Sequence, residues 1–157
     1  MMSRSFRPSI SKFFIKSFGV AKISISLVNF SSHNTYKIVN GVKGTLIKKI
    51  GDKDTHTSLP YYSNTSDVYF RKNKNGVCQA RVYIGNKKYL DFDWSHIHKN
   101  EGSNRVFEIG RVHVQVWSEN SKGEFIRLSN NARSMSNAEM KKYGPILKEF
   151  CPHIKLR

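Results

Sequence analysis

The chain has 157 residues, the size of a single domain, and 38% of them are hydrophobic, so disorder of the whole chain is excluded. Lys and Arg outnumber Asp and Glu by 27 to 11, which gives a net charge of +16. No apolar run reaches the roughly 18 residues that a transmembrane helix needs. The surplus charge lies toward the ends, because residues 1–51 carry nine Lys and Arg and no carboxylate. Such a charge favours salt-dependent binding of polyanions, above all nucleic acid.

The N-terminal sequence MMSRSFRPSISKFFIKSFG is rich in Arg, Lys, Ser and Phe. This composition is typical of a mitochondrial-type leader, or of a basic arm that lies on nucleic acid or anionic lipid. A short amphipathic helix is predicted over 13–21, and alternation of polar and apolar residues indicates a strand over 22–27. We therefore expect a basic, partly helical leader over residues 1–30 and a single domain over residues 31–157.

The pattern of the remaining chain predicts a sheet followed by a helix. Asn40–Gly41 is a strong turn signal and predicts a hairpin over 36–50. Ser136 and Glu139 form a capping box that begins a helix at residue 137, and Gly144–Pro145 is expected to break that helix before a second segment at 146–150. Short turns between the further strands favour an antiparallel meander. The predicted fold is α+β, a curved antiparallel sheet with a C-terminal helix. The further strands are expected at 67–70, 76–84, 88–94, 105–109, 111–117 and 125–128.

Three of the six histidines, His96, His98 and His113, lie between residues 89 and 117. Side chains alternate along a strand, so His113 is expected on the polar face of its strand, opposite the valines on either side of it. On that face a ligand could reach it. Asp91 and Asp93 also share a face, either as ligands of Mg²⁺ or, the preferred interpretation, as a solvated edge face that balances nearby lysines.

The preferred functional interpretation is metal-independent cleavage of RNA. A histidine has a pKa near 6.5, so His113 could act as base or acid together with His96 or His98. Arg111 or Arg81 would stabilise the charge of the phosphate. No cofactor is expected. Residues expected to bind substrate by charge or by base stacking are Tyr61, Tyr83, Lys87, Lys88, Trp117, Lys141 and Lys142.

Two alternatives remain open. The charge alone could serve a nucleic-acid-binding module that has no enzymatic activity. In the second alternative His96, His98 and His113 bind Zn or Fe together with Asp93, although no strong metal motif such as HExxH accompanies them. Cys78 and Cys151 have no zinc-ligand spacing, and the sequence does not favour a disulfide between them.

The segment 59–117 resembles the C-terminal toxin modules of bacterial polymorphic toxins of the RHS and contact-dependent types. The matching residues are Arg81 and Tyr83, then Asp91, Asp93 and Trp94, and finally His113 and Trp117. The resemblance implies a small α+β ribonuclease of the barnase–EndoU–colicin–RelE-like class, active in the cytoplasm of a producing or target cell and neutralised by a cognate immunity protein. Gln115 stands where these modules carry a second late histidine, so the catalytic pair would have to include His96 or His98.

Overall fold

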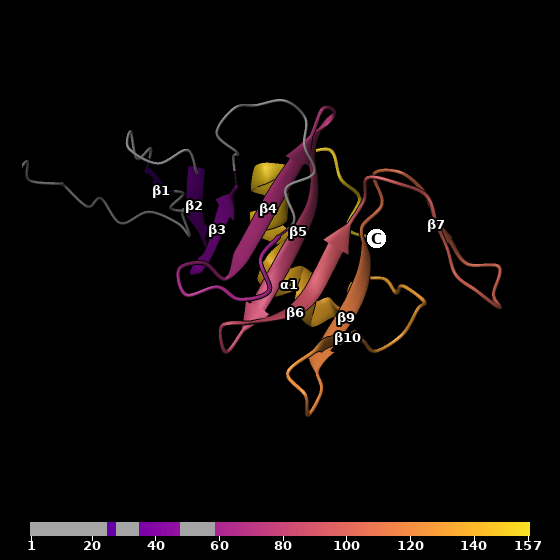
Figure 1. Ribbon diagram of the computed structural model, residues 1–157. Helices are drawn as coiled ribbons and strands as arrows, with labels where there is room; N and C mark the ends of the chain where they lie inside the picture. The colour runs from indigo at the N-terminus through magenta and orange to yellow at the C-terminus, as the bar shows by residue number, and fades with distance from the viewer. Residues whose placement is uncertain (1–24, 28–34, 48–58) are drawn as a thin grey trace, which may run out of the picture.

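The computed structural model describes residues 25–27, 35–47 and 59–157. These residues form an eight-stranded sheet, a separate two-stranded sheet and one helix, α1 (Asn137–Phe150) (Figure 1). The helix predicted over 13–21 lies outside the described residues. The strands are β1 (Ile25–Leu27), β2 (Thr35–Val39), β3 (Val42–Leu46), β4 (Val68–Asn73), β5 (Gly76–Ile84), β6 (Lys87–Asp93), β7 (His98–Lys99), β8 (Val106–Phe107), β9 (His113–Glu119) and β10 (Phe125–Arg127).

The predicted α+β class is confirmed, and the sheet is mostly antiparallel. Its strand order is β1-β2-β3-β4-β5-β6-β9-β10. Asn40 and Gly41 both have positive φ, at 51° and 79°, which builds the tight turn of the expected β2–β3 hairpin. The prediction of a pure meander is wrong where β3 and β4 pair in parallel, with Gly44 opposite Val68. A parallel pair needs a crossover connection and not a hairpin turn.

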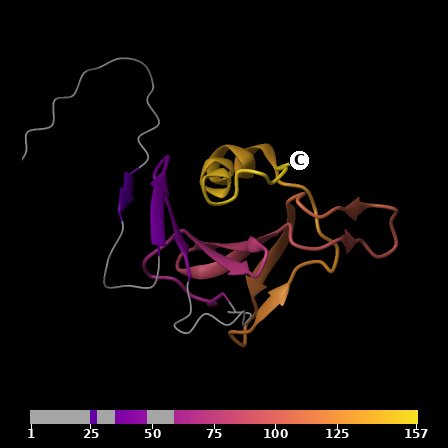
Figure 2. The ribbon, with the colours of Figure 1, turned by 90° about the horizontal axis from the view of Figure 1, so that it is seen from above.

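The chain between β6 and β9 departs from the expected meander. The strand predicted at 105–109 does not join the main sheet, and β9 pairs directly with β6, with Asp93 opposite His113. Residues 95–112 instead form an excursion whose strands β7 and β8 pair with each other, His98 opposite Phe107. Figures 1 and 2 show this hairpin projecting from the edge of the main sheet. The excursion returns His98 and Phe107 to the ring of His113.

Helix α1 is continuous through Pro145, so the predicted break at Gly144–Pro145 is wrong. Proline removes one hydrogen bond to the carbonyl four residues earlier, on Lys141, which is exposed and can turn to water. Burial of the residues on either side, Tyr143 and Ile146, holds the helix together. The predicted capping box is confirmed, with the Glu139 amide donating to Ser136 Oγ and the Ser136 amide donating to Glu139.

The two faces of the sheet differ in composition. Helix α1 covers the apolar face, and Figure 2 shows the sheet bending around it. Gly44 lies under the helix, where a Cβ would come within 2.8 Å of both Ile146 and Phe70, so a larger residue would push the layers apart. The opposite face, here called the polar face, carries cross-strand rows of polar side chains. Its central members in β4, β5, β6 and β9 are Arg71, Gln79, Arg81, Asp91, Asp93, His113, Gln115 and Trp117.

Candidate metal centre

His113 lies on the face of β9 that the sequence predicts, opposite Val112 and Val114, but it is not accessible. Its exposed fraction is 0%. The expectation that a ligand could reach it directly is therefore wrong. The imidazole is covered by three aromatic rings, those of Phe107, His98 and His96, at centroid distances of 5.4, 5.0 and 5.2 Å. Sequence reasoning missed Phe107, because its role depends on how the β7–β8 excursion folds back.

The structure brings His96, His98 and His113 into one cluster. One ring nitrogen from each lies within 4.8 Å of the corresponding nitrogens of the other two. The His98 and His113 rings are stacked, with 29° between their planes, whereas the His96 ring meets His113 edge-on at 85°. His113 is buried, His98 is half-buried and His96 is exposed. The cluster therefore opens to solvent on the side of His96.

Several nitrogens of the cluster are buried without a hydrogen-bond partner. They are both ring nitrogens of His113 and Nε2 of His98. A buried polar atom that makes no hydrogen bond costs about 1–3 kcal/mol. Burial, together with the neighbouring His96 and His98, lowers the pKa of His113, and this outweighs the opposite effect of Asp93. The Arg111 carbonyl also favours the protonated ring, although it is not placed to accept a well-formed hydrogen bond. His113 is thus neutral at pH 7 and has lone-pair electrons to offer a ligand.

Asp93 supports the cluster from the neighbouring strand. Its Oδ1 lies 3.2 Å from Nδ1 of His96 and accepts hydrogen bonds from the amide and hydroxyl of Ser95 at 2.9 and 3.0 Å. This contact occupies Nδ1 of His96 and leaves its Nε2 for a ligand. A carboxylate on the far nitrogen of a metal-binding histidine is a common arrangement, because it fixes the ring and makes it more basic. The hydrogen bond from the Ser95 amide to Asp93 forms an Asx turn, and the Asp93-x-Ser95 spacing is its signal in the sequence.

These residues fit a transition metal better than a hard cation. Imidazole suits Zn, Cu, Fe and Ni, whereas Mg²⁺ and Ca²⁺ prefer oxygen ligands. With Zn–N bonds of about 2.0–2.1 Å, tetrahedral ligand nitrogens lie about 3.3 Å apart. The 4.8 Å bound is wider than this, so the rings would have to rotate inward by roughly an ångström. His96, the exposed member, is the ring with room to move.

Arg81 and Asp91 form a buried ion pair in the middle of the polar face. Nε and Nη2 of Arg81 donate to the two carboxylate oxygens at 2.6 and 2.9 Å, and Nη1 donates to the carbonyls of Leu59 and Pro60. This placement indicates a structural role for Arg81. The preferred interpretation of Asp91 and Asp93 as a solvated edge face is wrong, since β6 is central and their exposed fractions are 3% and 7%.

The other residues expected to bind substrate are scattered. Tyr83 is buried and its hydroxyl donates to the Pro60 carbonyl at 2.6 Å. Lys87 is exposed and pairs with Glu119. Arg111 is exposed and lies two residues before β9 begins at His113. Lys141 and Lys142 lie on α1 beside the β2–β3 turn, on the helix side of the sheet. Tyr61 and Trp117 remain on the polar face, away from the histidines.

Lys88 is almost completely buried on the polar face. Its Nζ lies 3.0 Å from the centroid of the Trp117 ring, 5.0 Å from that of Tyr61 and 3.9 Å from Asp91 Oδ2. Burial lowers the pKa of Lys88 to about 8, with Asp91 acting in the opposite direction and Arg81 and Arg127 adding to the shift. The Trp117 ring favours the ammonium form and limits the shift.

The lowered pKa of Lys88 predicts that the free energy of unfolding rises with pH. An unfolded lysine has a pKa of about 10.4, so between pH 8 and 10 the unfolded chain binds more protons than the folded one, and stability rises with pH. We expect urea unfolding to show a gain on the order of 1–2 kcal/mol between pH 7.5 and 9.5, relative to the same interval in Lys88→Met. Burial raises the pKa of Tyr83, which lowers stability only near pH 10 and above, outside this window. Lys87→Met is the matched control, and parallel curves for wild type and Lys88→Met would contradict the prediction.

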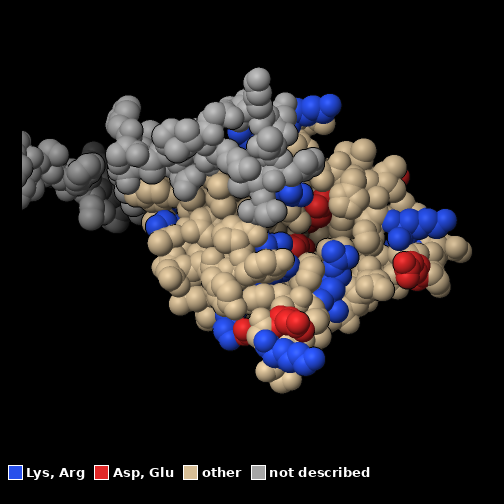
Figure 3. Space-filling model, viewed as in Figure 1, with Lys and Arg blue, Asp and Glu red and all other residues tan. Residues whose placement is uncertain are grey.

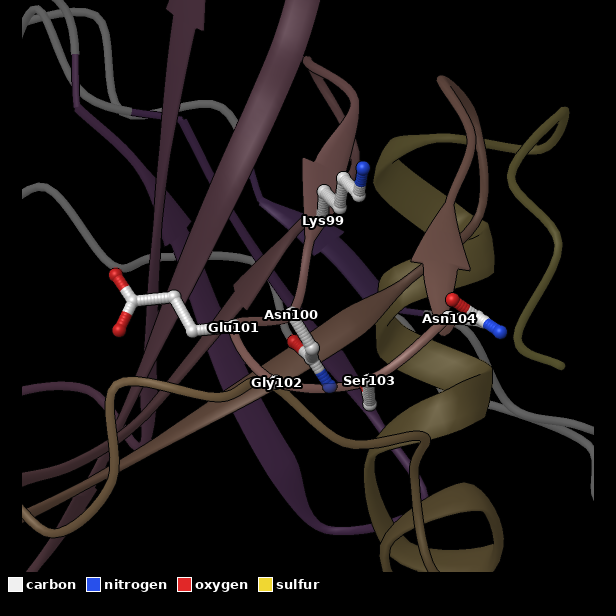
Figure 4. Close-up of a pocket in the computed structure, with 6 residues that line it drawn as sticks. All are labelled: Lys99, Asn100, Glu101, Gly102, Ser103 and Asn104. Atoms are coloured by element: carbon white, nitrogen blue, oxygen red, sulfur yellow. The ribbon is translucent and has the colours of Figure 1, made fainter.

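Two hollows lined by described residues do not bring reactive groups together. One of about 550 Å³ lies at the β7–β8 turn, and the side chains of Lys99, Glu101 and Asn104 point in different directions around it (Figure 4). Another, of about 270 Å³, is lined by Trp94 and by both cysteines, Cys78 and Cys151, which are free thiols. Burial raises the pKa of both, so neither is a ready nucleophile.

Helices in the described ranges are too short or too polar to cross a membrane. Comparison of the chain with protein-family models, with curated proteins and with solved structures finds no match. The case for function therefore depends on the histidine cluster and on the polar face around it.

Proposed function

We propose that His96, His98 and His113 bind one transition-metal ion, with Zn²⁺ as the expected occupant, and that the protein is a metal-dependent hydrolase. The observation that carries this proposal is the convergence of three imidazoles, two of which, His98 and His113, have buried nitrogens without a hydrogen-bond partner. Without a ligand, these nitrogens are a cost to the fold; a metal would satisfy one nitrogen of His113 and one of His98.

The arrangement resembles a catalytic metal site more than a structural one. Structural zinc sites are closed by four protein ligands, whereas catalytic sites keep three and an open position. Within the described residues the cluster has three such ligands, and it opens to solvent beside His96, whose side chain is 54% exposed. A zinc ion held by these three histidines would lower the pKa of a bound water to about 7 and so supply a nucleophile at neutral pH. Asp93 would hold His96 in place, and burial would keep His113 neutral.

Metal content measured by mass spectrometry tests the proposal directly. Protein loaded with Zn²⁺ and desalted should retain about one equivalent, and His98→Ala should retain almost none. His153→Ala removes an exposed histidine outside the cluster and should leave the metal content unchanged. Equal zinc retention in His98→Ala and wild type, or no retention in wild type, would refute the proposal.

The metal-independent ribonuclease expected from the sequence is the second candidate. The observation in its favour is the Asp93–His96 pair, since an exposed histidine oriented by a carboxylate can act as a general base. His113 fits the role of the catalytic acid poorly. A fully buried imidazole does not contact an RNA strand, and a neutral one is not a general acid at pH 7. Cleavage of RNA that survives EDTA and is lost in His96→Ala would favour this candidate. Its assignment to a toxin module with an immunity protein stays a prediction.

A further inference from the structure

The polar face carries a second group of side chains, separate from the histidines. Trp117, on β9, has Lys88 Nζ at 3.0 Å and Arg127 Cζ at 5.0 Å from its ring centroid. Next to them Tyr61 stacks on Phe125, with centroids 5.4 Å apart and 7° between the planes, and Tyr62 meets the same ring edge-on. We call these residues the aromatic–cation cluster: Tyr61, Tyr62, Lys88, Trp117, Phe125 and Arg127.

Several members of this cluster are exposed or have unused binding capacity. Tyr61 and Tyr62 are 56% and 52% exposed, and Arg127 is exposed on the edge strand β10. Tyr62 meets Phe125 at 71° and its hydroxyl donates to Glu119 Oε1 at 3.4 Å, which holds a half-exposed ring at the surface of the cluster. Nε1 of Trp117 is buried and has no hydrogen-bond partner. Its N–H can only donate, so the group that satisfies it must be an acceptor.

The cations of the polar face are in excess over its carboxylates. Asp91 pairs with Arg81, Asp93 with His96, and Glu119 with Lys87. Among the described residues no carboxylate pairs with Arg71 or Arg127, and Arg71 Nε is buried without a partner. Figure 3 shows this face, with Lys and Arg side chains spread across its middle. Buried N–H donors without partners and arginines without carboxylates favour an anionic ligand that is rich in hydrogen-bond acceptors.

The cluster and the metal site lie on one line. His113 and Trp117 are four residues apart on β9 and point to the same face, which places them about 13 Å from each other. Gln115 lies between them, half-buried and opposite Asp91. A ligand that reaches from one to the other must present stacking surfaces at one end and a bond for hydrolysis at the other. Phosphates and bases alternate in this way along a single strand of nucleic acid.

We propose that the aromatic–cation cluster binds a single-stranded nucleic acid and directs a phosphodiester bond, a few nucleotides away, to the histidine cluster. The inference rests on the proposed function for its chemical step. In that step the oxygen of a water molecule bonds to phosphorus and the P–O bond to the leaving sugar oxygen breaks. One water proton passes to that oxygen, and the other stays on the new phosphate, which ionises in neutral solution.

The test is fluorescence anisotropy with the full chain and labelled 12-nucleotide strands of unstructured RNA and DNA, and a DNA duplex, in EDTA at several salt concentrations. We expect Arg127→Gln to weaken binding of a single strand about three- to tenfold and to lower the salt slope by about one. Tyr62→Leu should weaken it about five- to tenfold, because one stacking platform is lost. The matched control is Arg157→Gln, on the helix side near Asn137, which removes the same charge and should change binding less than twofold.

The metal site and the nucleic-acid surface predict different results for the same variants. His98→Ala should keep its affinity for the strand while losing zinc and cleavage, whereas Arg127→Gln should keep its zinc. Equal effects of Arg127→Gln and Arg157→Gln, or tighter binding of the duplex than of either single strand, would overturn the nucleic-acid inference. If the protein retains no zinc but still binds the single strand in an Arg127-dependent way, the metal proposal is refuted and the proposed nucleic-acid surface is not.

Discussion

Chelation of zinc should lower the free energy of unfolding of the loaded protein by about 3–4 kcal/mol at a free metal concentration a few hundred times Kd. A ligand that binds only the folded state stabilises it by mass action, and the three ligands come from β7, β9 and the loop before β7, which only the folded chain brings together. Urea unfolding monitored by tryptophan fluorescence, with Zn²⁺ or with EDTA, measures the difference. His98→Ala should abolish it and His153→Ala should retain it.

The metal-free protein offers a sharper test of why His113 is a histidine. In EDTA, His113→Leu should be as stable as wild type or up to about 2 kcal/mol more stable, because an apolar side chain replaces a buried imidazole without hydrogen bonds. In zinc the same variant should lack the metal-dependent gain. A structural histidine would show the opposite result, a loss of stability in EDTA. That result would contradict the interpretation of the cluster as a ligand site.

The order of the strands was predictable wherever local chemistry sets it. Asn40–Gly41 fixes a tight turn, and the turn sequences on either side of residues 76–84 mark the observed bounds of β5. Ser136 and Glu139 likewise mark the start of α1. The parallel pairing of β3 with β4 was not predictable in this way, because it depends on where a long connection returns and not on any turn residue. Pro145 shows the same limit, since packing against the sheet outweighs the loss of one hydrogen bond.

The histidines show what sequence patterns tell about a site. Alternation along β9 predicts the face of His113 correctly, but it says nothing of what covers that face. The cover is the β7–β8 excursion, and its return places His96, His98 and Phe107 over the ring. With that cover in place, the expected acid–base residue is a buried imidazole, which we propose as a metal ligand. The HxH pattern alone was too common to favour a metal site, and the unpartnered nitrogens are what now favour it.

The largest loss of stability should follow from breaking the Arg81–Asp91 pair on one side. Both side chains are almost fully buried and joined by two hydrogen bonds, so Arg81→Met would leave a buried carboxylate with only Lys88 nearby, at 3.9 Å. Removing one partner of such a pair typically costs about 3–5 kcal/mol. The carbonyl of Leu59 would also lose its donor, whereas the carbonyl of Pro60 would keep the Tyr83 hydroxyl. We expect a loss in that range by urea unfolding at pH 7.

The double variant Arg81→Met/Asp91→Leu should recover at least half of that loss, because it removes both charges and fills the space with apolar atoms. Full recovery is not expected, since Lys88 would lose its carboxylate and the Leu59 carbonyl would stay unpaired. A folded double variant that still retains one zinc would show that Arg81 and Asp91 support the sheet and not the histidine cluster. A double variant no more stable than Arg81→Met would instead mean that the cost lies in the lost Leu59 and Pro60 contacts, and that Arg81 acts mainly by fastening this segment across the polar face.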